Sequence, residues 1–261
     1  MRVCHKPWAR VRGFFTGPTG LHLTMVLTRY GVREWLSATA VAALAATILL
    51  WLGWWGGLIG IGAGWLSVLW FFRDPIRRIR PSDDSGIMLC PADGKVSAIE
   101  TVDRHEAVGG PATVIRIFLS VLDVHINRSP AAGEVVAVRY APGAFHDART
   151  PESATENESN LIVLKLDDGQ TIGVRQIAGK IARRIVCRLK VGDRVEAGQR
   201  FGMIKFGSST ELILGRRNEV RLQVAVGQRV KAGLTVLAMI APVDPLGVTT
   251  TAASPTQAIN S

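Results

Sequence analysis

The chain has 261 residues, of which 48% are apolar, and its formal net charge is +10. This length predicts one main domain with an appendage, and a strongly basic balance favours anionic partners, either nucleic acid or an anionic membrane surface. Three cysteines, Cys4, Cys90 and Cys187, lie far apart and form no CxxC pair and no cluster with histidine. This spacing argues against a disulfide framework and against a zinc site, and we expect no metal.

A basic segment, residues 1–34, precedes an uncharged apolar stretch, residues 35–72. The stretch has 38 residues without Asp, Glu, Lys, Arg or His, whereas a single membrane span requires about 20. It therefore predicts two short helices that form a membrane hairpin. The turn is expected at Gly53–Gly57, since paired glycines break helices and the tryptophans there favour the membrane interface.

Basic residues flank the apolar stretch on both sides: Arg2, Lys6, Arg10, Arg12, Arg29 and Arg33 precede it, and Arg73, Arg77, Arg78 and Arg80 follow it. Cytoplasmic flanks collect Lys and Arg, so we expect both ends of the hairpin at the cytoplasmic face of the inner membrane. A signal peptide would start earlier and be shorter. A single span with an exported domain, the alternative, would leave four arginines outside.

Residues 73–245 are predicted to form a mainly β domain. Short runs rich in Val and Ile alternate with glycine-containing turns, as at residues 114–119, 161–164 and 220–224. Strands at intervals of about 8–12 residues are typical of a compact barrel or sandwich. The small polar tail, residues 246–261, is predicted to be disordered.

Two internal repeats support this fold class. Val-Gly-Asp-Arg-Val-Glu-Ala-Gly at 191–198 recurs as Val-Gly-Gln-Arg-Val-Lys-Ala-Gly at 226–233, and Pro-Ala-Asp-Gly-Lys-Val at 91–96 resembles Pro-Ala-Ala-Gly-Glu-Val at 130–135. Each contains a glycine turn followed by a β-branched residue. Such hairpin units would build a barrel of the type seen in biotinyl and lipoyl carriers.

The Gly207-Ser208 pair lies shortly after the apolar run at 201–204 and could support self-cleavage. A serine hydroxyl attacks its own preceding carbonyl only where the backbone bends sharply, and glycine permits the dihedral angles that this requires. Attack converts the amide to an ester, and elimination leaves a dehydroalanine that rearranges and loses ammonia to become a pyruvoyl group. Taken by itself, the pair is more typical of an ordinary loop.

Several further motifs occur in a fixed order around this pair. They are Phe-Arg-Asp-Pro at 72–75, Pro-Ala-Asp-Gly-Lys-Val at 91–96, Asp-Val-His-Ile-Asn-Arg-Ser-Pro at 123–130, Tyr-Ala-Pro-Gly at 140–143, Asn-Glu at 157–158 and Gly-Ser-Ser at 207–209. With these motifs the chain resembles the phosphatidylserine decarboxylases, specifically their short (archaeal or type A-like) form. The resemblance extends from the hairpin to about residue 240.

The resemblance implies a cut between Gly207 and Ser208, with Ser208 converted to a covalent pyruvoyl cofactor. It also implies a catalytic set of Ser208, His125 as base and Asp93 as the group that orients His125. From the residues alone, Asp93 fits a turn-forming Asp-Gly pair and His125 fits a core histidine equally well. Longer family members place a second histidine, assigned the triad role, three residues beyond the first, where this chain has Arg128. Whether His125 serves self-cleavage, decarboxylation or both is therefore open.

The implied activity is that of a pyruvoyl-dependent carboxy-lyase. The pyruvoyl carbonyl would form a Schiff base with the amine of phosphatidylserine and accept the electrons left by departing CO2, which yields phosphatidylethanolamine. The implied partners are phosphatidylserine in an anionic membrane and, after the cut, a heterodimer of residues 1–207 and 208–261. Arg128 and Arg139 are candidate anion contacts, whereas His105 and His146 are expected on the surface or in loops.

Three other functions were considered. A membrane-tethered carrier would need a lysine at a hairpin tip, and Lys205 lacks the flanking small or Met residues. A cell-wall zinc peptidase would need a His-x-His pair, yet no histidine follows His146. A nucleic-acid binder would need basic residues on a platform with stacked aromatics, but here the arginines cluster beside the apolar stretch.

Overall fold

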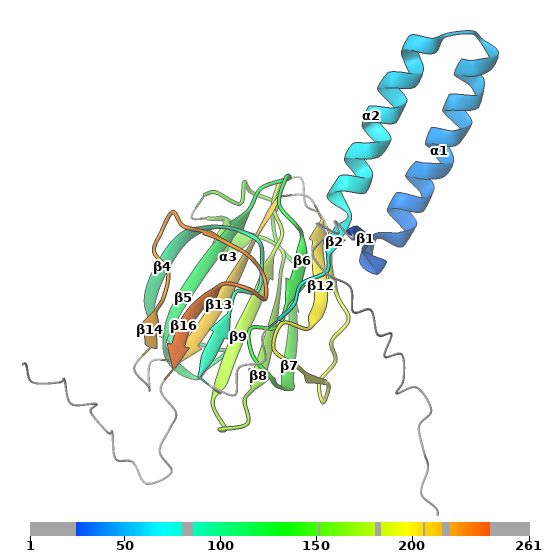
Figure 1. The fold of residues 1–261 in the computed structure, drawn as a ribbon. Coiled ribbons are helices and arrows are strands. Elements are labelled where there is room, and N and C mark those ends of the chain that lie inside the picture. The colour runs from blue at the N-terminus through cyan, green and yellow to red at the C-terminus, as the bar shows by residue number, and fades with distance from the viewer. Residues whose placement is uncertain are drawn as a thin grey trace, which may run out of the picture.

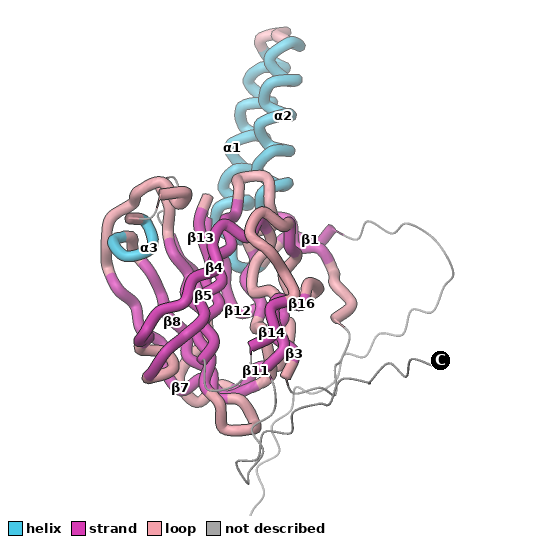
Figure 2. Tube along the Cα trace, turned by 90° about the vertical axis from the view of Figure 1, so that its left-hand side faces the viewer, coloured by secondary structure: helices cyan, strands magenta, loops and turns pink. Residues whose placement is uncertain are grey.

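The computed structural model describes residues 25–79, 86–150, 152–180, 184–205, 207–215 and 220–240. A pair of long helices stands on a β domain and projects away from it, as two perpendicular views show (Figures 1 and 2). The mainly β prediction is confirmed by this arrangement. Residues 1–24 of the predicted basic segment and the predicted disordered tail, 246–261, lie outside the described residues.

The apolar stretch forms two antiparallel helices, α1 (Val32–Trp51) and α2 (Trp55–Phe71). They are joined at Leu52–Trp54, where Gly53 adopts a φ of +67° that favours glycine. The turn is shorter than the predicted 53–57, because the backbone reverses at Gly53 alone and the two following glycines lie within α2. One glycine in the left-handed region is enough to end α1, and the helix restarts at once.

The helical hairpin exposes a large apolar surface. Leucine, isoleucine and tryptophan side chains on both helices are exposed; they include Leu44, Ile48, Trp51, Trp55 and Ile59. At about 1.5 Å per residue the 20 residues of α1 extend about 30 Å, close to the thickness of a bilayer core. By length and composition, α1 with the turn before it is sufficient to cross a membrane, whereas α2 is shorter.

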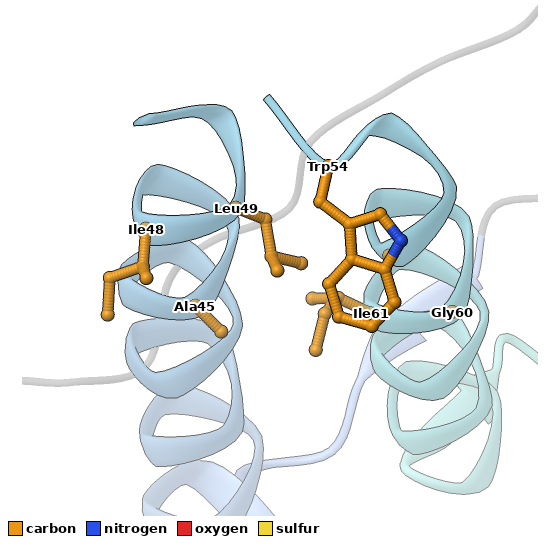
Figure 3. Close-up of a pocket in the computed structure, with 7 residues that line it drawn as sticks. Ala45, Ile48, Leu49, Trp54, Gly60 and Ile61 are labelled. Atoms are coloured by element: carbon orange, nitrogen blue, oxygen red, sulfur yellow. The ribbon is translucent and has the colours of Figure 1, made fainter. Parts of the chain in front are cut away.

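A groove of about 450 Å³ lies between the two helices near their connection. Figure 3 shows the indole of Trp54 lying along α2 near Ile61, with Leu49 of α1 pointing into the space between the helices. Every lining side chain is apolar or glycine, apart from the indole nitrogen of Trp54. The groove therefore offers no acid, base or nucleophile and is not a reaction site.

A short two-stranded sheet ties the base of the hairpin together. β1 (Met25–Leu27) precedes α1 and pairs antiparallel with β2 (Arg73–Pro75), which follows α2. A 3₁₀ turn, η1 (Arg29–Gly31), links β1 to α1, and the backbone N–H of Thr28 donates to the carbonyl of Phe72 at 2.9 Å. Both ends of the hairpin are thus fixed to the same edge of the β domain.

The β domain is built around one eight-stranded antiparallel sheet. Its order is β11 (Arg194–Val195), β7 (Gly133–Ala141), β8 (Ser159–Lys165), β9 (Thr171–Ile177), β13 (Ser208–Gly215), β5 (Gly110–Leu119), β4 (Gly94–His105) and β15 (Arg229–Val230). Two three-stranded sheets complete the domain: β10 (Arg184–Cys187), β12 (Arg200–Lys205) and β6 (Ile126–Arg128), and β14 (Val220–Leu222), β16 (Val236–Ile240) and β3 (Ile87–Leu89). A single-turn helix, α3 (Ser153–Glu156), lies in the loop before β8.

The two sequence repeats pair with each other. The strand in 191–198 pairs with Gly133 and Glu134 of the 130–135 motif, and the strand in 226–233 pairs with Gly94 and Lys95 of the 91–96 motif. Equivalent backbone bonds form in each pair, from Val135 N–H to Asp193 O and from Val96 N–H to Gln228 O, both 2.9 Å. The hairpin units expected from the sequence therefore close the two edges of the large sheet in the same way.

Strand β13 lies near the centre of the large sheet, between β9 and β5. Seven of its eight residues are buried, beginning with Ser208. The core around it is formed by branched aliphatic side chains from neighbouring strands, including Ile115, Ile117, Ile162, Leu164, Ile172, Leu212 and Leu214. The start of β13 is thus among the most constrained positions in the domain.

Candidate active site

The Gly207-Ser208 junction lies where β12 gives way to β13. Gly207 has a φ of +62°, in the left-handed region that glycine tolerates and other residues avoid. Ser208 then enters the sheet opposite Leu119 of β5, and Ser209 pairs with Ile177 of β9. A glycine in the left-handed region, followed at once by a strand paired on both sides, provides the kind of bend that the predicted attack on the preceding carbonyl needs.

The Ser208 side chain is fully buried, with 0% of the residue exposed. Its Oγ has no hydrogen-bond partner among the described residues. A buried hydroxyl normally finds a partner, because leaving one unsatisfied costs about 1–3 kcal/mol. The neighbouring Ser209 shows the ordinary case, since its Oγ donates to the carbonyl of Ala148 at 3.1 Å. Ser208 is therefore the exception, and its oxygen lone pairs remain available for attack.

His125 faces the junction from the segment just before β6. Its Nε2 lies 3.3 Å from the backbone nitrogen of Gly207, and its Nδ1 lies 2.9 Å from the carbonyl oxygen of Asp123. A carbonyl can only accept and a backbone N–H can only donate, so the proton must be on Nδ1. The imidazole is thus held neutral, with a basic lone pair on Nε2 directed at the junction.

The environment of His125 keeps the ring neutral. The residue is fully buried, and burial lowers its pKa from 6.5 to about 4, against smaller opposing contributions from Asp123. One wall of this environment is Phe71 at the end of α2, whose ring centroid lies 4.5 Å from that of His125. The hairpin therefore contributes directly to the desolvation of the imidazole.

A second contact between hairpin and junction involves Lys205, two residues before Gly207. Lys205 is 5% exposed and forms an ion pair with Glu34 in the first turn of α1. Arg184, opposite Lys205 in β10, lies 4.0 Å from the same carboxylate. Lys205 is thus a buried structural cation that anchors α1, which differs from the exposed hairpin-tip lysine of a carrier domain.

The carbonyl of Gly207, the group to be attacked, packs against the backbone of Gly179. A Cβ placed on Gly179 would lie 2.2 Å from Gly207 O, which is far inside contact distance. The loop that carries Gly179 is fixed by Asn157, whose amide donates to the carbonyls of Ala178 at 2.8 Å and His146 at 3.0 Å. Only a residue without a side chain can hold the backbone this close to the junction.

Asp93 has partners other than His125. Its two carboxylate oxygens each accept from Arg77 at 2.6 Å, and Oδ1 also accepts from the backbone N–H of Ala232 at 2.8 Å. The Nδ1 position of His125 that an orienting carboxylate would take is occupied by the Asp123 carbonyl. In this uncut chain the structure therefore does not bring Asp93 and His125 together as the sequence predicted, because the Asp-Gly turn at the start of β4 points the carboxylate at Arg77.

A chain of buried amides lies behind the junction. Asn127 donates to Thr210 Oγ1 at 3.1 Å and accepts from Gln176 at 2.9 Å, and Gln176 accepts in turn from Asn160 at 3.1 Å. These four side chains are at most 4% exposed. A fully satisfied buried network of this kind rigidifies its surroundings. Here it fixes β13 two residues after Ser208.

The remaining residues considered from the sequence lie away from the junction. Arg128 is buried against Gly198 and Asp74. Arg139 forms an exposed ion pair with Glu106. His146 lies in a loop with its Nε2 3.0 Å from Glu156, and His105 ends β4. Phe71, Gly179 and Gln176 were not predicted, because no local pattern in the sequence distinguishes them.

The sequence is similar to known proteins over most of its length. A family model described as phosphatidylserine decarboxylase matches residues 66–238, which include the end of α2, the junction and all the residues placed around it above except Glu34. A phosphatidylserine decarboxylase proenzyme of Symbiobacterium thermophilum is 46% identical over 203 residues, 78% of this chain and 92% of the relative.

Two further relatives bear the same name. The phosphatidylserine decarboxylase proenzyme of Gluconacetobacter diazotrophicus is 43% identical over 225 residues, 84% of this chain and 97% of its own length. That of Rhodopirellula baltica is 40% identical over 217 residues, 82% of this chain and 88% of its own length. The similarity thus covers most of this chain and nearly the whole length of these three relatives.

Proposed function

Because this chain belongs to the phosphatidylserine decarboxylase family, we propose that it converts phosphatidylserine to phosphatidylethanolamine after cutting itself between Gly207 and Ser208. The observation that carries the site assignment is the buried Ser208 hydroxyl, which has no hydrogen-bond partner in the described part of the chain and follows a glycine in the left-handed region. The assignment to the short form of the family stays a prediction from the sequence.

In the self-cleavage step, Ser208 Oγ forms a bond to the Gly207 carbonyl carbon and the amide C–N bond breaks, which gives an ester. His125 is the proposed base, because its neutral Nε2 faces the junction. In the uncut chain Nε2 accepts from the Gly207 N–H and not from the Ser208 hydroxyl, so the proposed step requires His125 to exchange the first partner for the second. Elimination then releases the Gly207 carboxylate, and hydrolysis of the resulting dehydroalanine releases ammonia.

The residues at the junction fit a pyruvoyl group made from Ser208. The converted residue would keep the buried position at the start of β13, opposite Leu119 of β5 and next to Gly207, which Gly179 and His125 approach. When present, the pyruvoyl group supplies an electron sink for the charge left by loss of CO2. The role left to His125 is to hold or deliver a proton beside that position, and burial of the site excludes bulk water.

The two products of the cut are proposed to stay together as a heterodimer of residues 1–207 and 208–261. Strand β13 opens the smaller chain and is paired with β5 on one side and β9 on the other. Strand β16, also in the smaller chain, pairs with β3 of the larger. Breaking one peptide bond removes none of these ladders, so separation would require unfolding of the central sheet.

We propose that the helical hairpin places the enzyme at the membrane with the β domain on the cytoplasmic side. Both ends of the hairpin return to one edge of the β domain and carry arginines, including Arg29, Arg73 and Arg77. Basic residues favour the cytoplasmic face and contribute about 1 kcal/mol each near an anionic surface. The substrate is a lipid, so attachment limits the search to two dimensions.

The proposal is tested by mass spectrometry of the purified full-length chain. We expect two chains, of 207 and 54 residues counted from the sequence, with a pyruvoyl group at the start of the smaller one. Ser208→Ala should give one intact chain without decarboxylase activity, whereas Ser209→Ala, which removes only the bond to Ala148, should still be cut. Activity in a chain with an intact amide at this junction would refute the mechanism.

A further inference from the structure

A pocket of about 590 Å³ lies at the base of the hairpin, away from the junction. It is formed by the segment before α1, the segment after β2 and the turn before β12. Its lining residues include Leu27, Arg29, Asp74, Arg77, Arg128 and Arg200. Ser208, Gly207 and His125 do not line it, so the proposed reaction leaves this pocket without a function.

Positive charge predominates in this pocket. Arg128 and Arg200 share a single carboxylate, Asp74, at 3.5 Å and 2.8 Å respectively. Arg77, which lines the pocket, is paired with Asp93, which does not. Arg29 lies over the ring of Tyr30 and, among the described residues, has no carboxylate partner. The described lining has two acidic residues: Asp74, which is shared by two arginines, and Glu196, which is exposed.

The pKa of Arg128 reflects the same excess. This pKa is lowered to about 10, first by burial and then by the neighbouring Arg200 and Arg77, against the opposing effect of Asp74 and Asp93. A buried guanidinium is ordinarily compensated by carboxylates or by a bound anion. Among the described lining residues there are fewer carboxylates than guanidiniums, and the 590 Å³ of space beside them is sufficient for an anion.

The position of the pocket indicates the source of that anion. Its wall at Val26 and Leu27 leads directly into η1 and α1, so it opens at the level where the hairpin would enter the membrane. Guanidinium groups bind phosphate oxygens bidentately. Arg128 comes three positions after His125, which corresponds to about 10 Å along an extended chain. We propose that this pocket binds the phosphate of a second, non-substrate anionic phospholipid and holds it beside the base of the hairpin.

The test measures binding to the full-length Ser208→Ala chain in detergent, by calorimetry, so that no reaction interferes. Dihexanoyl phosphatidic acid should bind, and dihexanoyl phosphatidylcholine and inorganic phosphate should bind at least about tenfold more weakly. Arg29→Gln with Arg200→Gln should weaken phosphatidic acid binding by at least about tenfold. The control pair, Arg139→Gln with Arg194→Gln, removes the same charge from exposed ion pairs and should bind normally.

Arg29→Gln alone is a second variant, because Arg29 is exposed and its loss should leave the fold intact. The proposal would be overturned if both the single and the double variant bound phosphatidic acid as tightly as the Ser208→Ala chain does. It would also be overturned if that chain bound inorganic phosphate as tightly as phosphatidic acid. In the self-cleaved enzyme, phosphatidic acid that raises the KM for phosphatidylserine without changing kcat would also overturn it and assign the pocket to the substrate. The calorimetric result does not depend on self-cleavage, so it can fail while the proposed function stands.

Discussion

The ring of Phe71, the last residue of α2, lies 4.5 Å from the imidazole of His125 at an angle of 41°. The helical hairpin and the proposed base are therefore in direct contact, although Phe71 and His125 are 54 positions apart in sequence. The ion pair of Glu34 with Lys205 joins the other helix to the strand that leads into the junction. Displacement of the hairpin would expose both His125 and the chain before Gly207.

The contact itself can be tested with Phe71→Ala. Removing the ring admits water to His125, so the pKa of the imidazole should rise from about 4 towards its ordinary value of 6.5. NMR titration of His125 in the uncut Ser208→Ala chain measures this directly. Leu66→Ala, on the same helix at a residue that is 59% exposed, is the matched control and should leave the titration unchanged. An unchanged pKa in Phe71→Ala would show that the hairpin does not desolvate the site.

Acid should destabilise the chain through His125. Its pKa is about 4 when folded and 6.5 ordinarily, so the unfolded chain binds more protons between these values and stability falls as the pH drops through this window. The loss attributable to this residue is about 3 kcal/mol at pH 4, with the full contribution present above pH 6.5.

Denaturant unfolding of Ser208→Ala at pH 7 and pH 4 measures the total loss. The same chain with His125→Gln lacks this titration, while the carboxylates titrate in both. The difference between the two chains should therefore be about 3 kcal/mol. Equal losses in both would contradict the buried, neutral state of His125.

Gly179→Ala should block self-cleavage. The added Cβ would meet the Gly207 carbonyl at 2.2 Å and displace the group that Ser208 attacks. A displacement of about 1 Å at a reacting centre reduces rates about a hundredfold. We therefore expect the rate of self-cleavage, measured on gels from the loss of uncut chain over time, to fall by at least that factor. Gly110→Ala, where nothing lies within 4 Å of the new Cβ, should cut at the normal rate. Normal cutting of Gly179→Ala would remove Gly179 from the site.

Asp93→Asn separates two roles for this carboxylate. If Asp93 mainly holds Arg77, the variant should lose about 3 kcal/mol of stability, because it leaves a buried guanidinium unpaired. The pH dependence of self-cleavage should then keep its shape. The orienting role predicted from the sequence would instead shift that pH dependence. Asp167→Asn breaks the exposed pair with Arg194 and should cost less than about 1 kcal/mol.

The sequence by itself determined the features that depend on local composition and spacing. The uncharged stretch predicted the helical hairpin, the Val- and Ile-rich runs predicted a mainly β domain, and the repeats at 191–198 and 226–233 predicted equivalent hairpin units. The Gly207-Ser208 pair was recognisable only together with the ordered motifs around it, because the pair by itself is typical of an ordinary loop. The turn was placed too broadly at 53–57, since glycine does not by itself exclude helix.

Only the tertiary structure decided which of these residues meet. The contact of Phe71 with His125 and the approach of Gly179 to Gly207 depend on strand register and on the seating of the hairpin, and no short-range pattern encodes either. The choice of Arg77 rather than His125 as the partner of Asp93 depends on the direction of one turn. The packed domain buries the Ser208 hydroxyl where no other described residue bonds it, and it keeps His125 neutral, because desolvation is a property of the whole domain.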